Sequence, residues 1–268
     1  MRRIAHLSDL HFGRTRPELL EPMIAAVNGA SVDLIALSGD LTQRARDHQF
    51  REARAFIDRL EAPCLVVPGN HDVPLDNPLL RFLAPWRRYR RWIGADLEPV
   101  HADEAMVVVG INTADPMAWQ RGRVRSGSLR RACAEFAQAD GRMLVVVAHH
   151  PFEHLPEETK EPMPGAAEAL ERLAGCGAHI VLSGHLHSWR AAPFSLPRGR
   201  RGILQVQAGT GLSTRLRREE NDFNLLRIES GEVVIERFVP DPATHHFTRT
   251  ANLRFRRGPS GWEDGVAQ

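Results

Sequence analysis

The sequence has 268 residues, 43% of them hydrophobic and 25% charged, which is ordinary for a globular protein with one large α/β domain or two small ones. Its formal net charge of +2 argues against a dedicated nucleic-acid binder. No apolar run approaches the roughly 18 residues that span a bilayer, and Met1-Arg-Arg leads directly into a strand without a signal peptide, so we expect a cytoplasmic protein.

The three cysteines, Cys64, Cys133 and Cys176, lie far apart in the sequence. Each stands in an apolar or helical context, and their odd number does not suit a complete set of disulfides. We therefore predict three reduced cysteines that act as small core residues, with neither a disulfide framework nor a zinc site.

The first quarter of the chain alternates between apolar strands and amphipathic helices. Strands are predicted over residues 3–8, 33–38 and 64–67, and helices over residues 17–29 and 47–60. Strands that alternate with helices in this way are typical of a parallel sheet.

Residues 73–98 interrupt this rhythm and are predicted to form a helical cap insertion. Within them lies a basic and aromatic helix over residues 82–93. Three roles suit it: a surface helix that packs aromatic residues such as Phe82 and Tyr89 on the core, a cap that turns its arginines toward an anionic substrate, or a surface that binds a membrane or nucleic acid. The helical spacing of the aromatic residues favours packing alone.

The remainder of the chain continues the α/β pattern and then becomes β-rich. Strands are predicted at 106–111, 143–148 and 179–183, with helices at 126–139 and 165–174. After these come β segments at 203–208, 223–228, 233–239 and 247–255. We predict a single domain over residues 1–257 and a loose C-terminal tail over residues 258–268.

Five of the predicted strands stop at clusters of Asp, His or Asn. The clusters are Asp9-Leu10-His11, Gly39-Asp40, Asn70-His71-Asp72, His149-His150 and His185-Leu186-His187. Strand ends at the rim of a sheet are where open α/β folds bind ligands. These residue types offer oxygen and imidazole nitrogen to divalent metals, and none of the clusters offers a thiolate. The pattern therefore predicts a metal centre in which Asp40 bridges two metals.

In order and context, these clusters resemble the motifs of the calcineurin-like metallophosphoesterases. The matching residues are Asp9-x-His11, Gly39-Asp40, Gly69-Asn70-His71-Asp72, His149 before Pro151, and Gly184-His185-x-His187. The resemblance spans residues 9–187, about two thirds of the chain. It implies an α/β fold, the four-layer αββα sandwich of that family, with a dinuclear metal site at the strand ends.

Carried over position by position, the resemblance assigns ligands for two metal ions. The first ion takes Asp9, His11, Asp40 and His187, and the second takes Asp40, Asn70, His149 and His185. The ions are divalent or of mixed valence, and these ligands admit Mn, Fe, Zn or Co. His71 matches the family's non-ligand catalytic histidine, which stabilises the transition state or protonates the leaving oxygen. The implied nucleophile is a hydroxide that bridges the two metals.

One departure guides the choice of branch within the family. Many phosphoprotein phosphatases of the family read Gly-Asp-x-x-Asp, whereas this chain has Gln43 at the last position. The turn at Asn70 and the Gly184-His185-x-His187 motif resemble the bacterial class III cyclic-nucleotide phosphodiesterases and general phosphodiesterases. The resemblance implies a hydrolase of small-molecule phosphodiesters, with 3′,5′-cyclic nucleotides first and glycerophosphodiesters or lipid-linked phosphates as alternatives.

Two further functions stay open from the sequence. One is a DNA exonuclease of the same superfamily, which the near-neutral charge disfavours; the other is an inactive scaffold that binds a partner through residues 82–93. Substrate-binding residues are not assigned, and Arg215 is only a candidate loop contact. The β segments after residue 203 offer an edge through which two copies could pair as a homodimer.

Overall fold

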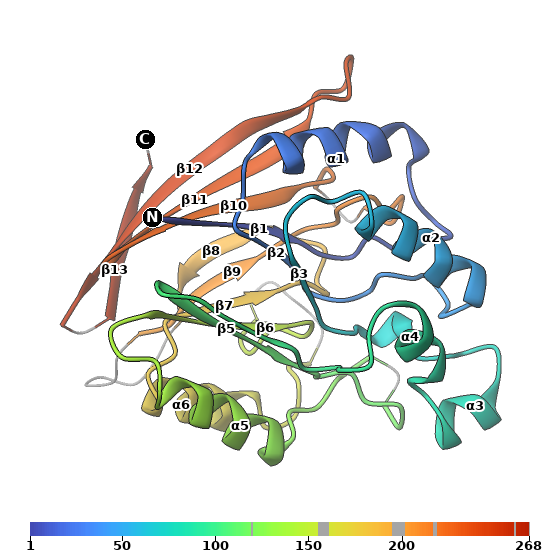
Figure 1. The fold of residues 1–268 in the computed structure, drawn as a ribbon, viewed down its shortest axis with the longest axis horizontal. Helices are drawn as coiled ribbons and strands as arrows, with labels where there is room; N and C mark the ends of the chain where they lie inside the picture. Colours follow the sequence, from blue (N-terminus) through green and yellow to red (C-terminus); the bar gives the residue numbers. More distant parts are fainter. Residues whose placement is uncertain (119, 155–160, 195–201, 217–218, 260, 268) are drawn as a thin grey trace.

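Two mixed β-sheets lie face to face at the centre of the molecule, and helices cover the outer face of each sheet (Figure 1). The computed structural model describes residues 1–118, 120–154, 161–194, 202–216, 219–259 and 261–267. This arrangement confirms the predicted α/β fold with two sheets and flanking helices.

The first sheet has seven strands in the order β13-β12-β11-β10-β1-β2-β3. Its parallel part consists of β1 (Arg2–Leu7), β2 (Leu34–Leu37) and β3 (Cys64–Val66). Its antiparallel part consists of β10 (Phe223–Glu229), β11 (Glu232–Pro240), β12 (Phe247–Gly258) and β13 (Gly261–Ala267). The N-terminal strand β1 therefore lies in the middle of the sheet, paired with β10 on one side and β2 on the other.

The second sheet has six strands in the order β4-β5-β6-β7-β9-β8. Its parallel strands are β5 (Met106–Ile111), β6 (Met143–Ala148), β7 (Ile180–Ser183) and β9 (Leu204–Gln207). The antiparallel strands β4 (Val100–Ala102) and β8 (Arg190–Pro193) form its two edges.

Helices flank the two sheets on opposite sides of the molecule (Figure 1). The short 3₁₀ helix η1 (Pro17–Leu19), α1 (Leu20–Gly29) and α2 (Asp47–Ile57) pack on the first sheet. On the second sheet lie α5 (Ser126–Phe136) and α6 (Ala166–Gly175). Among the described residues, no helix is long and apolar enough to cross a membrane.

Three separate apolar cores hold these four layers together. Along β2, Leu34 and Ala36 join the core between the sheets, whereas Ile35 and Leu37 join the core beneath α1 and α2. Side chains alternate between the two faces of a strand, so a strand that is buried on both faces must be apolar throughout. This explains why the parallel strands read as continuous apolar runs in the sequence.

The predicted helix over residues 82–93 is two short helices instead. They are α3 (Pro78–Leu83) and α4 (Arg87–Trp92), and Pro85 lies between them. Proline lacks an amide hydrogen and disfavours a helical residue before it, which accounts for the break. Tyr89 packs in the core as expected, but Phe82 is exposed.

The prediction of a loose C-terminal tail is wrong for the part of residues 258–268 that the structure describes. Residues 261–267 form β13, which pairs antiparallel with β12. Trp262 is buried, and its Nε1 donates to the carbonyl of His179. Gly258 at the end of β12 lies opposite Gly261 at the start of β13, so the glycines and proline there signalled a change of direction between two strands and not disorder.

The prediction of three reduced cysteines is also wrong, because Cys133 and Cys176 form a disulfide. It joins α5 to the residue that ends α6, with a Cα–Cα distance of 5.4 Å. The two positions lie 43 residues apart, so only the packing of the two helices brings them together. Cys64 is free and half-buried, as expected.

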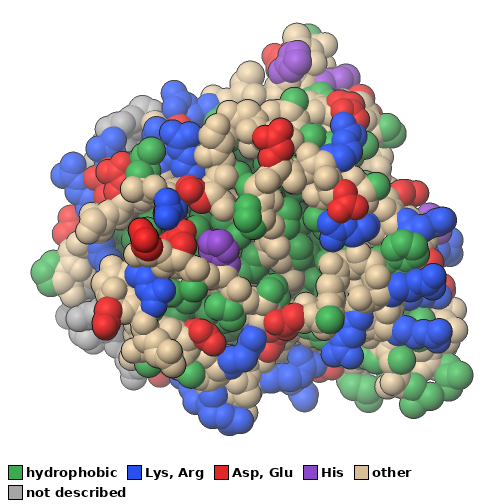
Figure 2. Space-filling model, viewed as in Figure 1, with side chains coloured by type: hydrophobic (Ala, Val, Ile, Leu, Met, Phe, Trp, Pro, Cys, Tyr) green, Lys and Arg blue, Asp and Glu red, His purple; other side chains and the backbone are tan. Residues whose placement is uncertain are grey.

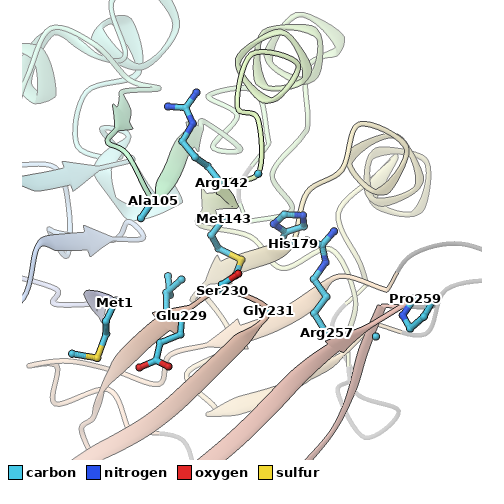
Figure 3. Close-up of a pocket in the computed structure, with 13 residues that line it drawn as sticks. Met1, Ala105, Arg142, Met143, His179, Glu229, Ser230, Gly231, Arg257 and Pro259 are labelled. Carbon is cyan, nitrogen blue, oxygen red and sulfur yellow. The ribbon is translucent and has the colours of Figure 1, made fainter.

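A hollow of about 580 Å³ lies at the end of the sandwich where the parallel strands begin (Figure 3). Its lining includes Met1, Met143 at the start of β6, and the turn at Ser230 between β10 and β11. Arg142 and Glu229 supply charged side chains to its rim. The hollow shares no lining residue with the Asp and His clusters, which follow the opposite ends of the strands.

His6 is expected to make stability depend on pH. It is fully buried in β1, it contacts Ser38 Oγ through Nε2 at 2.9 Å, and burial lowers its pKa to about 3. Below a pH of about 6.5, the usual pKa of histidine, His6 binds a proton in the unfolded chain but not in the folded chain. Stability therefore falls as the pH falls. Between pH 7 and pH 5, the free energy of unfolding of the native chain should fall through this effect by about 2 kcal/mol. The His6→Gln variant has no such group, so its free energy of unfolding should fall by about 2 kcal/mol less.

Urea denaturation at both pH values measures this difference. The matched control is His246→Gln, because His246 is exposed on the surface. Equal pH dependence in the native chain and His6→Gln would contradict the assignment.

Candidate metal centre

Five of the predicted metal ligands adopt a backbone conformation that is rare outside glycine. The φ angles are 52° at Asp9, 50° at His11, 51° at Asp40, 71° at His185 and 58° at His187. Such left-handed residues cost about 1–3 kcal/mol each and cluster at functional sites. All five follow the ends of buried strands, so the sharp turns aim their side chains at a common point beyond the sheets.

Asp9, His11 and His187 form the first group of side chains that could hold a metal ion. Asp9 Oδ1 lies 3.1 Å from His187 Nε2 and 3.5 Å from His11 Nε2. The two imidazole Nε2 atoms are 3.3 Å apart. Asp9 Oδ1 is fully buried and lacks a hydrogen-bond partner of good geometry. Three donor atoms thus converge without satisfying one another, which fits a bound cation.

Asp40 lies between this group and a second one formed with His149. Its Oδ2 is 3.8 Å from His11 Nε2 on one side and 3.4 Å from His149 Nε2 on the other. Asn70 Oδ1 lies 3.1 Å from His149 Nε2. The ring of His185 stands next to that of His149, with centroids 5.1 Å apart. The position of Asp40 is the one that a bridging ligand would need.

Hydrogen bonds fix the orientation of both carboxylates. Asp9 Oδ2 accepts from Ser8 Oγ at 2.7 Å and from the amide of His185 at 2.9 Å, which leaves Oδ1 for the centre of the cluster. Asp40 Oδ1 accepts from the amide of His71 at 2.7 Å. Ser8 therefore positions a ligand. Such supporting contacts orient metal ligands and raise affinity.

The imidazoles are oriented in the same way. His149 Nδ1 donates to the carbonyl of Ser38 at 2.8 Å, and His187 Nδ1 donates to the carbonyl of Arg215 at 2.8 Å. A proton on Nδ1 leaves Nε2 with its lone pair directed into the cluster. In the neutral form, both histidines would present Nε2 to a metal. Burial lowers the pKa of His149, but the charge of Asp40 and a hydrogen bond to it raise that pKa to about 9, so a bound cation would replace the Nε2 proton.

The electrostatics of the cluster favour a cation at its centre. Burial raises the pKa of Asp9, but the charge of His187 and the close approach of the His11 and His187 rings hold it well below its usual range. Burial opposes ionisation of Asp40 too, while His149 and His71 keep the Asp40 pKa well below the ordinary value. Two buried carboxylates are therefore ionised and in need of positive charge.

Two glycines allow the strands to approach closely enough to build this cluster. A Cβ atom at Gly69 would lie 2.2 Å from Asp40 Oδ1, and one at Gly184 would lie 2.4 Å from Asp9 Oδ2. Both carboxylates therefore occupy space that any larger residue would fill. This is the physical reason for glycine immediately before Asn70 and His185.

His71, the predicted catalytic histidine, lies at the edge of the cluster, with a ring nitrogen within 4.8 Å of donor atoms of His11 and Asp40. Its ring packs edge-on against His11, with centroids 4.9 Å apart. Nδ1 donates to the carbonyl of Gln43 at 2.8 Å, and Nε2 accepts from Arg215 Nη1 at 2.9 Å. Burial lowers the pKa of His71, so the neutral ring is favoured.

Arg215 is the residue that sequence reasoning underrated. It was only a candidate loop contact, but its guanidinium contacts His71 and its carbonyl orients His187. No motif marks it, because it lies in a loop 28 residues after His187. An arginine-rich loop between apolar strands was the available signal, and it did not single out Arg215.

Asp72 closes the turn that carries Asn70 and His71. Its carboxylate accepts from the amides of Leu41, Thr42 and Gly69 at 2.9–3.1 Å. These bonds tie the segment after β2 to the segment after β3. Asp72 thereby fixes Asp40 and Asn70 relative to each other.

His150 faces the same cluster as its neighbour His149. Strand alternation would turn two successive side chains to opposite faces, but β6 has already ended before His149, and the ring centroids of His150 and His185 are 4.5 Å apart. His150 contacts Thr113 Oγ1 through Nδ1 at 2.8 Å and the carbonyl of Gln120 through Nε2 at 3.0 Å. It forms the wall of a cavity of about 210 Å³ that also reaches His185.

A four-layer sandwich with buried Asp and His side chains converging at its strand ends is the arrangement expected of a metallophosphoesterase. A sequence profile of the calcineurin-like phosphoesterases matches residues 2–189, so the chain belongs to that family. The family resemblance inferred from the motifs is thus confirmed.

Curated relatives of this chain are phosphodiesterases and a pyrophosphatase. A probable cyclic nucleotide phosphodiesterase of Synechococcus sp. is 26% identical over 69% of this chain and 72% of its own length. A glycerophosphodiester phosphodiesterase of Enterobacter lignolyticus is 30% identical over 26% of this chain and 29% of its own length. A UDP-2,3-diacylglucosamine pyrophosphatase of Chlamydia muridarum is 33% identical over 26% of this chain and 22% of its own length.

Solved structures share the fold at low sequence identity. A purple acid phosphatase from yellow lupin superposes with a TM-score of 0.63 and 14% identity over 89% of this chain. The match covers 51% of the lupin protein, so this chain spans about half its length. Vacuolar protein sorting 29 of Cryptosporidium parvum gives a TM-score of 0.51 and 12% identity over 95% of this chain and 98% of its own.

Substitution of Gly69 by Ala is expected to disrupt metal binding. The new Cβ would occupy the place of Asp40 Oδ1 and displace that carboxylate. Affinity for Mn²⁺ should fall about 10- to 100-fold, as when a supporting contact of a metal ligand is lost. Calorimetric titration with Mn²⁺ measures the effect.

The control is Gly29→Ala at the end of α1, where a Cβ atom would have no neighbour within 4 Å. Circular dichroism should show both variants folded. Native affinity in Gly69→Ala would show that Asp40 does not depend on this close approach.

Proposed function

We propose that the protein is a metal-dependent phosphodiesterase that hydrolyses a small-molecule phosphodiester, with 3′,5′-cyclic nucleotides as the first candidate substrates. The observation that carries this proposal is the convergence of buried Asp and His donor atoms around Asp9 Oδ1 and Asp40 Oδ2. The similarity to the cyanobacterial probable cyclic nucleotide phosphodiesterase supports the substrate class.

The donor atoms suit two metal ions. Asp9, His11 and His187 would hold one ion, His149, Asn70 and His185 would hold the other, and Asp40 would contact both. The nitrogen and oxygen donors admit Mn, Fe, Zn or Co. When bound, such ions neutralise phosphate oxygens and make a water molecule acidic enough to react near neutral pH.

His71 and Arg215 supply the groups that act on the substrate beside these ions. The guanidinium of Arg215 is a fork of donors that matches two oxygens of a phosphate. In the structure it donates to His71 Nε2, and in our proposal it moves to a phosphate oxygen when substrate enters. The released Nε2 then takes up a proton from solvent and passes it to the leaving oxygen, while the Nδ1 proton stays hydrogen-bonded to the carbonyl of Gln43.

The cavity beside His185 gives room for the organic part of the substrate. It measures about 210 Å³, and Gln120, Arg121, His150 and Met163 belong to its lining. A phosphodiester has two ester groups, so a diesterase needs space on both sides of the phosphorus. Local similarity to the Enterobacter glycerophosphodiester enzyme makes glycerophosphodiesters the second candidate class.

The test is a substrate panel with Mn²⁺-loaded protein and with Asp40→Ala. The panel contains 3′,5′-cyclic AMP, glycerophosphocholine, an aryl phosphodiester, an aryl phosphomonoester and single-stranded DNA. Because Asp40 would contact both ions, Asp40→Ala should lose activity about 10²-fold or more. Chelation should abolish hydrolysis, and Mn²⁺ should restore it.

Asp140→Ala is the matched control, because Asp140 is exposed in the loop before β6. Turnover of DNA alone would replace the proposal with an exonuclease. Absence of hydrolysis across the panel with metal bound would support the inactive scaffold.

The role of Arg215 gives a separate prediction. Arg215→Ala removes a charged donor to the phosphate, so kcat/KM for the phosphodiester should fall about 10- to 100-fold. Arg215→Lys should recover part of this loss, because it retains the charge without the fork. Steady-state kinetics of both variants measure the change.

Arg130→Ala serves as its control, because Arg130 is exposed on α5. Unchanged kinetics in Arg215→Ala would assign the guanidinium to structure alone.

A further inference from the structure

An apolar patch is exposed on α3 and on the loop beside it. Leu79, Phe82 and Leu83 of α3 are 70%, 56% and 76% exposed, and Met117 is 77% exposed. These are four of the seven large apolar side chains exposed among the described residues. Arg81 Nη2 donates to the carbonyl of Ala118 at 2.9 Å, which holds the Met117 loop against α3.

The helix α3 is inverted relative to an ordinary surface helix, because apolar side chains are exposed on it and its charged side chain is buried. Its one charged residue, Arg81, is 7% exposed and points inward, where Nη1 donates to the carbonyl of Pro74. Leu79, Phe82 and Leu83 point outward instead, and only Leu80 is half-buried. A surface helix normally buries its apolar face and exposes its charges. The inversion indicates that the apolar face has a partner.

Basic residues on the neighbouring helix α4 indicate the charge of that partner. Tyr89 is buried and donates to the carbonyl of Val66, which anchors α4 to the end of β3. Arg87, Arg90 and Arg91 are exposed, and within the described part of the chain none of them forms an ion pair with an acid. Green apolar side chains over α3 and blue side chains above them lie on the same rim in Figure 2.

We propose that this surface docks the protein on anionic lipid bilayers. The docking surface comprises Leu79, Phe82, Leu83 and Met117 with Arg87, Arg90 and Arg91. Exposed leucine and phenylalanine enter the boundary between headgroups and acyl chains, and arginines contact the lipid phosphates. The apolar side chains supply the hydrophobic attraction and the arginines supply the electrostatic attraction that together hold a protein on a membrane surface.

Other partners fit these residues less well. A two-fold dimer through the docking surface would bring two sets of uncompensated arginines together, which is unfavourable. Nucleic acids need aromatic faces on which bases stack, whereas three of the four exposed apolar side chains are aliphatic. The proposal is independent of the chemical reaction that the metal centre performs.

Co-sedimentation of the full chain with vesicles tests the proposal. Vesicles of phosphatidylcholine with phosphatidylglycerol should bind the protein, pure phosphatidylcholine should bind it at least tenfold more weakly, and added salt should weaken binding. The double variant Phe82→Ser, Leu83→Ser and the triple variant Arg87→Gln, Arg90→Gln, Arg91→Gln should each bind at least tenfold more weakly. Both variants alter exposed side chains, so denaturation curves should match the native chain.

Control variants use exposed residues of the same types elsewhere. Leu216→Ser and Arg130→Gln should bind vesicles like the native chain. Equal binding by the docking-surface variants and the native chain would overturn the proposal, as would no binding to anionic vesicles. A concentration-dependent dimer that Phe82→Ser, Leu83→Ser abolishes would assign the surface to a second copy and also overturn it.

Discussion

Two buried carboxylates, Asp9 and Asp40, impose the constraint on which the rest of the structure depends. Negative charge removed from water requires opposite charge and hydrogen bonds nearby. Imidazoles that follow β6 and β7 supply the opposite charge. Amide and hydroxyl donors such as Ser8 supply the hydrogen bonds. Because these groups come from both sheets, the charge is balanced only when the whole sandwich has formed. The three apolar cores therefore support the site, and they offset the left-handed turns at its ligands.

Most of the fold could be predicted from the sequence because its strands are buried on both faces. A continuous apolar run that stops at Gly-Asp or at Gly-His indicates a buried strand, and it also indicates which end of that strand faces the site. The ligand clusters were recognisable for the same reason, since each follows a strand within a few residues. By contrast, the edge strand β13 was missed, because its sequence GWEDGVA contains two glycines and two acidic residues, which are poor strand formers, whereas most of β12 was predicted.

Other features depend on contacts that no local pattern encodes. The disulfide requires that α5 and α6 lie side by side, and neither helix contains information about the other. The contact between Arg215 and His71 joins loops 144 residues apart. His150 follows a strand but belongs to a turn, so the two-residue alternation of β6 did not apply to it. In each case tertiary packing decided the outcome.

The central place of β1 has a consequence for the order of folding. The strand that leads to Asp9 takes β10 as its neighbour, and Arg2 pairs with Ile228. Until the last third of the chain is synthesised, one edge of β1 has no hydrogen-bonding partner, and His6 lacks its contact with Asn224. Native contacts between such distant segments slow folding and leave an exposed edge meanwhile. The metal ligands nearest the N-terminus are therefore made first but are among the last to reach their final surroundings.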